Sequence, residues 1–180
     1  MYLSNISISK IKPSNYKDVY NFQCEYLDEE SYGDFIKRVK ANPDLYLVAY
    51  DENELVGVCY SEPFSQEKNY ISLQGIAVNL DEEKGYARKG IGSRLIESLE
   101  KIVIKKGYNK MGLGSADDKR VESFYLKNGF HPVELVAKAK DGKEYERLKV
   151  RDYNSGLIKK QELYQKHKPW EVIFIFEKTY

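Results

Sequence analysis

The residues of this sequence best suited to binding an anion lie in one stretch, residues 85–96, with the sequence G-Y-A-R-K-G-I-G-S-R-L-I. Before it, residues 70–78 form a short run rich in β-branched and aromatic side chains, which predicts a strand. After it, apolar residues recur with helical spacing over residues 92–106 and end at Gly107, which predicts an amphipathic helix. The glycines are therefore expected at a strand-to-helix turn.

A helix that starts at this turn would offer an anion site, because its first N–H groups have no acceptor within the helix and carry the positive end of its dipole. Gly90 and Gly92 lack a Cβ and would let a phosphate approach the main chain. Arg88, Lys89 and Arg94 add positive charge nearby. We expect a diphosphate here, although this motif alone also fits an ordinary turn with solvated basic residues.

Two common phosphate-binding loops do not fit this stretch. Gly85 and Gly90 have the glycine spacing of a P-loop, GxxxxGK[ST], but the next two residues, Ile91 and Gly92, are not Lys and Ser or Thr. In the dinucleotide fingerprint GxGxxG, Leu95 occupies the third glycine position. The stretch therefore predicts neither kind of nucleotide site.

Residues 87–92, A-R-K-G-I-G, resemble instead the pyrophosphate loop of the GCN5-related N-acetyltransferase (GNAT) family, Gln/Arg-x-x-Gly-x-Gly/Ala, which binds acetyl-coenzyme A. Ala87 stands at the Gln/Arg position, and the arginine follows as Arg88. Residues 118–130, D-K-R-V-E-S-F-Y-L-K-N-G-F, are similar to the family's Asn-x-x-Ala-x-x-Phe-Tyr-x-x-x-Gly-Phe. The two motifs stand in the family's order with a predicted strand between them, and the resemblance covers residues 1–135.

The resemblance implies an acetyl-CoA-dependent N-acetyltransferase that acts on a primary amine of a small metabolite, polyamine, aminoglycoside or peptide. It implies an α/β (α+β) fold with a mixed central sheet of about seven strands flanked by helices. The length of 180 residues and the absence of a linker-like segment predict a single domain over residues 1–180. Acetyl-CoA is the implied cosubstrate, without a metal. Its implied binding residues are Ile76, Ala77, Val78, Ala87, Arg88, Lys89, Gly90, Ile91, Gly92, Ser93, Asp118 and Tyr125.

Tyr125 is the predicted catalytic residue. The resemblance places its hydroxyl near the coenzyme sulfur, where a phenol can protonate or hydrogen-bond the departing thiolate. The alternative is core packing with Phe124 and Phe130, which a helix and a following strand would bury in any case.

The general base is left unassigned. Several family members carry a glutamate on the strand before the loop, whereas this strand has Ser72 and Gln74, which cannot take a proton at neutral pH. Four carboxylates could act directly or through water: Glu25, Asp28, Glu29 and Glu62. The missing glutamate and Ala87 keep a second hypothesis open, a non-catalytic acyl-CoA-binding or regulatory module.

Composition argues against several other classes of function. Of the 180 residues 32% are charged, but the formal net charge is only +1, so we expect no nucleic-acid partner. No apolar run approaches membrane-spanning length and no signal-peptide pattern is present, so we expect a cytoplasmic protein without a membrane partner. Cys24 and Cys59 form no CxxC motif, and His131 and His167 lack a nucleophile motif, so neither a metal site nor a hydrolase triad is predicted.

The remaining elements are expected to position these residues. Strands are predicted over residues 6–11, 45–50, 55–60, 70–78, 110–114 and 170–176. In the resembled family, the helix pair expected between residues 13 and 43 helps to wall the acceptor site. Residues 139–169 are predicted to be an insert with a helix over residues 156–168. We expect this insert to cover the acceptor site, to form an oligomer contact such as a homodimer, or to protect the sheet edge.

Overall fold

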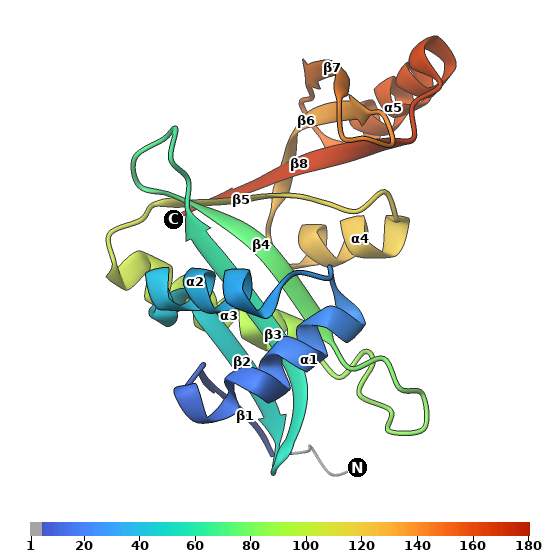
Figure 1. The fold of residues 1–180 in the computed structure, drawn as a ribbon. Coiled ribbons are helices and arrows are strands. Elements are labelled where there is room, and N and C mark those ends of the chain that lie inside the picture. Colours follow the sequence, from blue (N-terminus) through green and yellow to red (C-terminus); the bar gives the residue numbers. More distant parts are fainter. Residues whose placement is uncertain (1–4) are drawn as a thin grey trace. The chain divides into compact units, whose positions relative to one another are not determined.

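A computed structural model describes residues 5–180 (Figure 1). The chain divides into two compact units, Met1–Asn109 and Lys110–Tyr180. Each unit has its own strands, helices and buried side chains. The single domain predicted over residues 1–180 would therefore consist of two such units.

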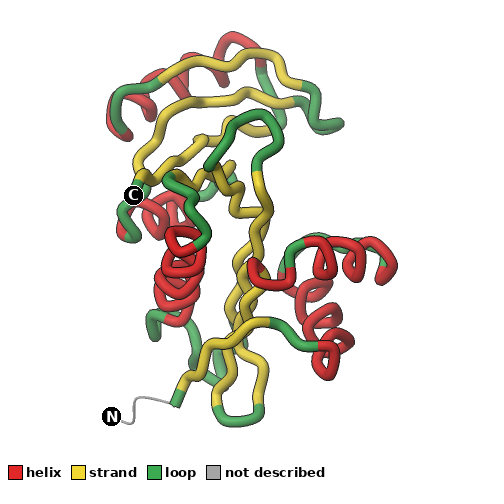
Figure 2. The backbone as a smooth tube through the Cα atoms, turned by 90° about the vertical axis from the view of Figure 1, so that its left-hand side faces the viewer, coloured by secondary structure: helices red, strands yellow, loops and turns green. Residues whose placement is uncertain are grey.

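The first unit is an antiparallel sheet with helices on both faces. Its strands pair in the order β1-β2-β3-β4. The elements in chain order are β1 (Ile6–Lys10), η1 (Pro13–Asn15), α1 (Tyr16–Tyr26), α2 (Tyr32–Ala41), η2 (Pro43–Leu45), β2 (Tyr46–Asp51), β3 (Glu54–Pro63), β4 (Tyr70–Val78) and α3 (Ile91–Lys105). Figures 1 and 2 together show α1 and α2 on one side of these strands and α3 on the other.

Both faces of this sheet are packed. On the α1 and α2 side, the core is made by Ile11, Val19, Phe22, Phe35, Val39, Tyr46, Val48, Val58 and Tyr60. On the other side, α3 buries Ile91, Leu95 and Leu99, which recur every four residues and so share one helix face. Gly57 of β3 allows this helix to come close, because a Cβ there would lie 3.1 Å from a Leu95 methyl group. The amphipathic pattern of residues 92–106 thus predicted the right helix and its buried face.

The second unit has its own antiparallel strands, in the order β5-β8-β6-β7. Its elements are β5 (Lys110–Gly114), α4 (Lys119–Lys127), β6 (His131–Lys138), β7 (Glu144–Lys149), α5 (Tyr153–His167) and β8 (Glu171–Thr179). Gly156 lets α5 approach β8, since a Cβ there would lie 2.5 Å from the Phe174 ring.

The predicted strands over residues 70–78 and 110–114 agree with β4 and β5 residue for residue. The last strand, predicted over residues 170–176, is β8, and Trp170 before it is 64% exposed. The predicted insert contains the expected helix, α5, and also β7, which was not predicted. Residues 5–180 therefore contain eight strands, four in each unit, where about seven were expected.

Candidate active site

The loop between β4 and α3 leads into a helix whose first N–H groups have no side-chain cap. Gly85, Arg88 and Gly90 have φ angles of +63°, +61° and +77°, in the left-handed region that glycine adopts most easily. Gly90 is the N-cap of α3 and has no side chain to cap the first N–H groups, and the first turn of the helix has no acidic residue. The N–H groups at the start of α3 therefore suit an anionic ligand, and the diphosphate position stays a prediction.

The three basic residues near the loop, Arg88, Lys89 and Arg94, make different contacts. Arg88 and Lys89 are exposed beside Gly90, and the Lys89 ammonium lies 5.5 Å from the centroid of the Tyr86 ring. Arg94, in contrast, donates from Nη2 to the main-chain oxygen of Ile6 over 2.7 Å, so it ties α3 to β1. Arg88 and Lys89 are therefore the better candidates for counter-charges to a phosphate.

Side chains outside the predicted coenzyme site hold this loop in place. Tyr86 is buried, and its hydroxyl donates to Glu54 Oε2 at the start of β3 over 3.2 Å. Lys84 forms an ion pair with the same carboxylate. The hydrogen bond from Lys84 lowers the pKa of Glu54, and burial together with Glu54 raises the pKa of Tyr86 to about 12. The loop is thus fastened to the β2–β3 hairpin.

Asn79, directly after β4, fastens the other end of the loop. Its Oδ1 accepts hydrogen bonds from the Asp81 main-chain N–H over 2.8 Å and from the Tyr26 hydroxyl over 3.1 Å. Its main-chain N–H donates to the oxygen of Val56 over 2.9 Å. Because Tyr26 is the last residue of α1, this buried asparagine joins α1 to the start of the loop.

Strand β4 carries the remaining candidate coenzyme residues of the first unit. Ile76, Ala77 and Val78 are half-buried and pair with residues 57–59 of β3. The register shifts just before them, because Tyr60 pairs with Gly75 but Ser61 pairs with Leu73. Gln74 is the extra residue of this bulge, a distortion common beside active sites.

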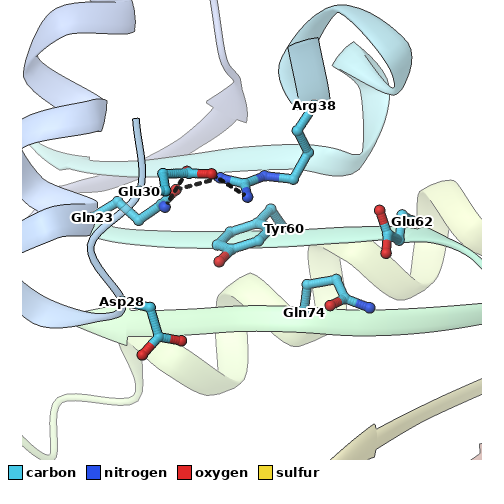
Figure 3. Close-up of a pocket in the computed structure, with 7 residues that line it drawn as sticks. All are labelled: Gln23, Asp28, Glu30, Arg38, Tyr60, Glu62 and Gln74. Carbon is cyan, nitrogen blue, oxygen red and sulfur yellow. Dashed lines mark hydrogen bonds and ion pairs between the residues drawn. The ribbon is translucent and has the colours of Figure 1, made fainter. Parts of the chain in front are cut away.

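The bulge borders a pocket of about 260 Å³ (Figure 3). The pocket is lined by Gln23, Asp28, Glu30, Arg38, Tyr60, Glu62 and Gln74. These residues come from α1, the α1–α2 connection, α2, β3 and β4. Of the four candidate bases, the pocket includes Asp28 and Glu62 but not Glu25 or Glu29.

Arg38 lies on one wall of this pocket, and both terminal nitrogens of its guanidinium are hydrogen-bonded. Its guanidinium forms an ion pair with Glu30 through two nitrogens, and Nη2 also donates to Gln23 Oε1 over 2.9 Å. The hydroxyl of Tyr46 donates to the same Gln23 oxygen over 2.6 Å. The guanidinium carbon lies 4.3 Å from the centroid of the Tyr60 ring. The positive charge of Arg38 is therefore balanced and held by Glu30.

Asp28 and Glu62 differ from Glu30 in having no ion-pair or hydrogen-bond partner for their carboxylates among residues 5–180. Tyr60 is 7% exposed, and its hydroxyl likewise has no hydrogen-bond partner in the described chain. Burial raises the pKa of the Tyr60 phenol, Arg38 opposes the shift, and Glu30 and Asp28 add to it. The phenol is therefore protonated and neutral at neutral pH.

In the second unit, the two candidate residues of the 118–130 motif have structural contacts. Asp118 is the N-cap of α4, and its Oδ1 accepts from the Arg120 main-chain N–H over 2.7 Å. Tyr125 is 8% exposed, and its ring centroid lies 5.8 Å from that of Phe130 and 5.9 Å from that of Phe176. The aromatic packing expected as the alternative for Tyr125 is present, and its role as an acid remains a prediction.

The second unit also contains a buried ion network that was not predicted. Glu122 is fully buried on α4, and the Lys160 ammonium of α5 lies 2.7 Å from its Oε1 and 2.5 Å from Asp117 Oδ1. Tyr153 donates to Glu122 Oε2 over 2.5 Å, and Tyr164 donates to Asp117. These contacts fix α5 to α4.

Residues 5–180 contain neither a metal-binding cluster nor a membrane-spanning helix. In that range, no cluster of three or more His, Cys, Asp or Glu residues is arranged to hold a metal ion. The helices of the same range are too short or too polar for any of them to cross a membrane.

Comparison with solved structures gives similar folds at low sequence identity. The ribosomal-protein-S18-alanine N-acetyltransferase from Escherichia coli is 16% identical with a TM-score of 0.64, over 97% of this chain and 93% of that one. Arabidopsis thaliana Naa50, in complex with the bisubstrate analogue CoA-Ac-MVNAL, is 13% identical with a TM-score of 0.68, over 97% and 99%. The PaiA N-acetyltransferase from Thermoplasma acidophilum, in complex with coenzyme A, is 19% identical with a TM-score of 0.56, over 98% and 99%. The predicted fold class is thereby confirmed.

Comparison with sequences gives the family. A search of curated proteins found no match. The model of the Acetyltransferase (GNAT) family matches residues 11–130, two-thirds of the 180 residues, and includes both the loop before α3 and the 118–130 motif. The resemblance inferred from the two motifs is confirmed, and the chain belongs to the Acetyltransferase (GNAT) family.

Proposed function

We propose that this protein transfers the acetyl group of acetyl-CoA to a primary amine, which attacks the thioester directly. One observation carries the proposal: β4 leads into a loop that suits a diphosphate, and Gln74 of the same strand lines a pocket with two carboxylates that have no partner among residues 5–180. A donor site and an acceptor site can therefore adjoin one strand. The family supplies the reaction class, and the similar folds in complex with coenzyme A or a CoA-containing analogue support the cosubstrate.

In this proposal, the main-chain N–H groups of Ile91, Gly92 and Ser93 hold the diphosphate, with Arg88 and Lys89 as counter-charges. Ile76, Ala77, Val78, Ala87, Gly90, Asp118 and Tyr125 complete the proposed coenzyme set. No metal is needed, because the thioester is already activated and the reaction requires mainly positioning.

The proposed reaction forms a bond between the amine nitrogen and the acetyl carbonyl carbon and breaks the bond from that carbon to sulfur. The amine must first be neutral. With an ordinary pKa of about 10.4, an alkylamine is neutral only about once in 2,500 molecules at pH 7, a deficit of roughly 4.6 kcal/mol. Asp28 or Glu62, directly or through water, would accept the amine proton, and Tyr125 would supply a proton to the thiolate.

The coenzyme site is tested by Gly92→Asp. A carboxylate at the start of α3 would occupy the phosphate's space and repel it, so acetyl-CoA binding should be lost. Gly33→Asp is the matched control, since Gly33 is exposed on α2 and the nearest atom to a Cβ there is 3.8 Å away. If folded Gly92→Asp protein bound acetyl-CoA within about twofold of the parent, less than about 0.4 kcal/mol, the proposed diphosphate site would be wrong.

Catalysis is tested by titrating acetyl-CoA calorimetrically and then measuring free thiol with a panel of monoamines, diamines, amino acids, aminoglycosides and peptides. Binding with amine-dependent thiol release supports the proposed transferase. Binding without release on any amine would favour a non-catalytic acyl-CoA-binding module, to which Ala87 and the absence of a β4 glutamate point. Absence of acetyl-CoA binding would overturn both functions.

A further inference from the structure

The acceptor pocket carries unbalanced negative charge. Three carboxylates and one guanidinium line it, and the guanidinium of Arg38 is already paired with Glu30. The two negative charges that remain are those of Asp28 and Glu62, which have no partner in the described part of the chain. A ligand that balances this charge would carry two cationic nitrogens.

A second observation independently points to a ligand. The Tyr60 side chain is more than nine-tenths buried, lines the pocket, and has no hydrogen-bond partner for its hydroxyl among residues 5–180. Figure 3 shows this hydroxyl directed toward the side of the pocket where Asp28 lies. Gly75 makes the position available, because a Cβ there would lie 2.5 Å from a ring carbon of Tyr60. A phenol oxygen in this position can accept a hydrogen bond from an amine or ammonium group.

The two carboxylates lie toward opposite ends of the pocket. Glu62 pairs with Ser72, early in β4, whereas Tyr60 pairs with Gly75, just before the proposed coenzyme residues 76–78. Asp28 follows α1, whose last residue is hydrogen-bonded to Asn79 after β4. Asp28 and Tyr60 therefore lie toward the coenzyme end of the strand, and Glu62 lies toward the other end.

The spacing of Tyr60 and Glu62 and the volume of the pocket suit a small ligand. Tyr60 and Glu62 are two residues apart on one face of a strand, about 6.6 Å between Cα atoms, a distance that a chain of a few methylene groups can bridge. The pocket volume of about 260 Å³ lies below the range of roughly 300–1,000 Å³ typical of sites for drug-sized ligands. Both observations favour a compact aliphatic acceptor.

Resting on the proposed function, we infer that the acceptor is a short alkyl diamine. One amine, at Asp28 and Tyr60, attacks the thioester, and the other stays as an ammonium ion at Glu62. The acetylated nitrogen loses its proton to Asp28 or a water bound there, while the second nitrogen keeps its protons throughout.

Two measurements test this inference. The first compares kcat/KM for 1,4-diaminobutane, 1-aminobutane and a peptide with a free N-terminal amine; the diamine should exceed both others by about tenfold or more, the scale of one charge-assisted hydrogen bond. The second titrates the diamine into protein saturated with coenzyme A. A kcat/KM for the monoamine equal to that for the diamine, or a preference for the peptide, would overturn the inference. Either result would still support the proposed transferase function. If no amine reacted, failure of the diamine to bind in the titration would overturn it as well.

Variants separate the two ends of the pocket. Glu62→Gln should reduce the preference for the diamine over the monoamine by about tenfold, since it removes the partner of the second ammonium. Asp28→Asn should lower kcat with both amines, since it removes the carboxylate beside the reacting nitrogen. Glu29→Gln, an exposed residue outside the pocket, is the matched control and should leave the preference unchanged. A Glu62→Gln protein that kept the full preference and the same melting temperature would contradict the inference.

Discussion

The two units each contain an ion network centred on one cation, and the networks differ in what they leave unpaired. In the first unit, Arg38 pairs with Glu30, and the two side chains are 22% and 18% exposed. In the second unit, Lys160 bridges Asp117 and Glu122, and Glu122 is not exposed at all. Every carboxylate of the Lys160 network has a partner, whereas two carboxylates beside Arg38 have none in the described chain.

The difference separates a structural use of buried charge from a binding use. A buried charge is costly unless it is paired, so a network with all its members satisfied holds elements together and has nothing left for a ligand. The pocket instead uses Glu30 to neutralise Arg38 and keeps Asp28 and Glu62 available. Unpaired charge beside a neutralised cation is therefore the better indication of a binding site.

The largest expected effect is on the second unit. Lys160→Met should lower the free energy of unfolding by about 3–5 kcal/mol, because Glu122 would be left buried without its cation. Denaturant unfolding of the variant measures this. The double variant Lys160→Met with Glu122→Leu removes both charges and should recover part of the loss. If the single variant lost less than about 1 kcal/mol in the free energy of unfolding, the Lys160 network would contribute little to stability. The contrast between a structural and a binding network would then not hold.

The next largest effect is expected for Tyr125→Phe, which tests whether the second unit also contributes to catalysis. Tyr125→Phe keeps the packed ring and should cost no more than about 1 kcal/mol of stability. If the hydroxyl protonates or stabilises the thiolate, kcat should fall by roughly 10²-fold or more while acetyl-CoA affinity changes little. Steady-state and single-turnover kinetics, with a melting curve, measure this. Unchanged single-turnover rates would assign Tyr125 to the core and make the second unit's contribution structural.

A smaller loss of stability is expected in the pocket. Arg38→Met removes the cation but leaves Glu30 hydrogen-bonded to Gln23 and partly accessible to water. We expect a loss of about 1.5–3 kcal/mol in the free energy of unfolding, less than for Lys160→Met. The same urea titration compares the two variants directly. A larger loss for Arg38→Met would reverse the assignment of the structural and the binding network.

Local signals in the sequence predicted most of the strands and helices. Residues 70–78 were predicted without error, because a run rich in β-branched and aromatic side chains favours a strand. Residues 110–114, K-M-G-L-G, have no such side chains, but they stand between the predicted long helix and the 118–130 motif, where a further strand was expected, and they were also predicted without error. The helix predicted over residues 92–106 agrees with α3 to within one residue at each end, because glycine spacing and helix periodicity are local signals. Strand β7 was missed because it is a largely exposed edge strand, with charged residues and no apolar alternation.

The networks could not be predicted in the same way. Lys160 meets Glu122 across 38 residues, and only the packing of α5 brings them together. Likewise, Glu62 and Asp28 were among four candidate bases, and nothing in the local sequence shows which of them share a pocket or which carboxylate neutralises Arg38. Charge pairing at long sequence separation is a property of the tertiary structure.

The smallest expected effect concerns the loop before α3, where a paired network supports a binding site. Tyr86→Phe removes the hydrogen bond to Glu54, while the ion pair with Lys84 and the buried ring remain. Because the lost hydrogen bond joins a neutral phenol to a partly exposed carboxylate, acetyl-CoA affinity should fall only severalfold, about 1 kcal/mol, and kcat should not change. Calorimetric titration measures this, with Tyr145→Phe, an exposed tyrosine of the second unit, as control. A loss of affinity without a loss of stability would show that Tyr86 acts by positioning the loop, whereas equal losses of both would make this network structural, like the one around Lys160.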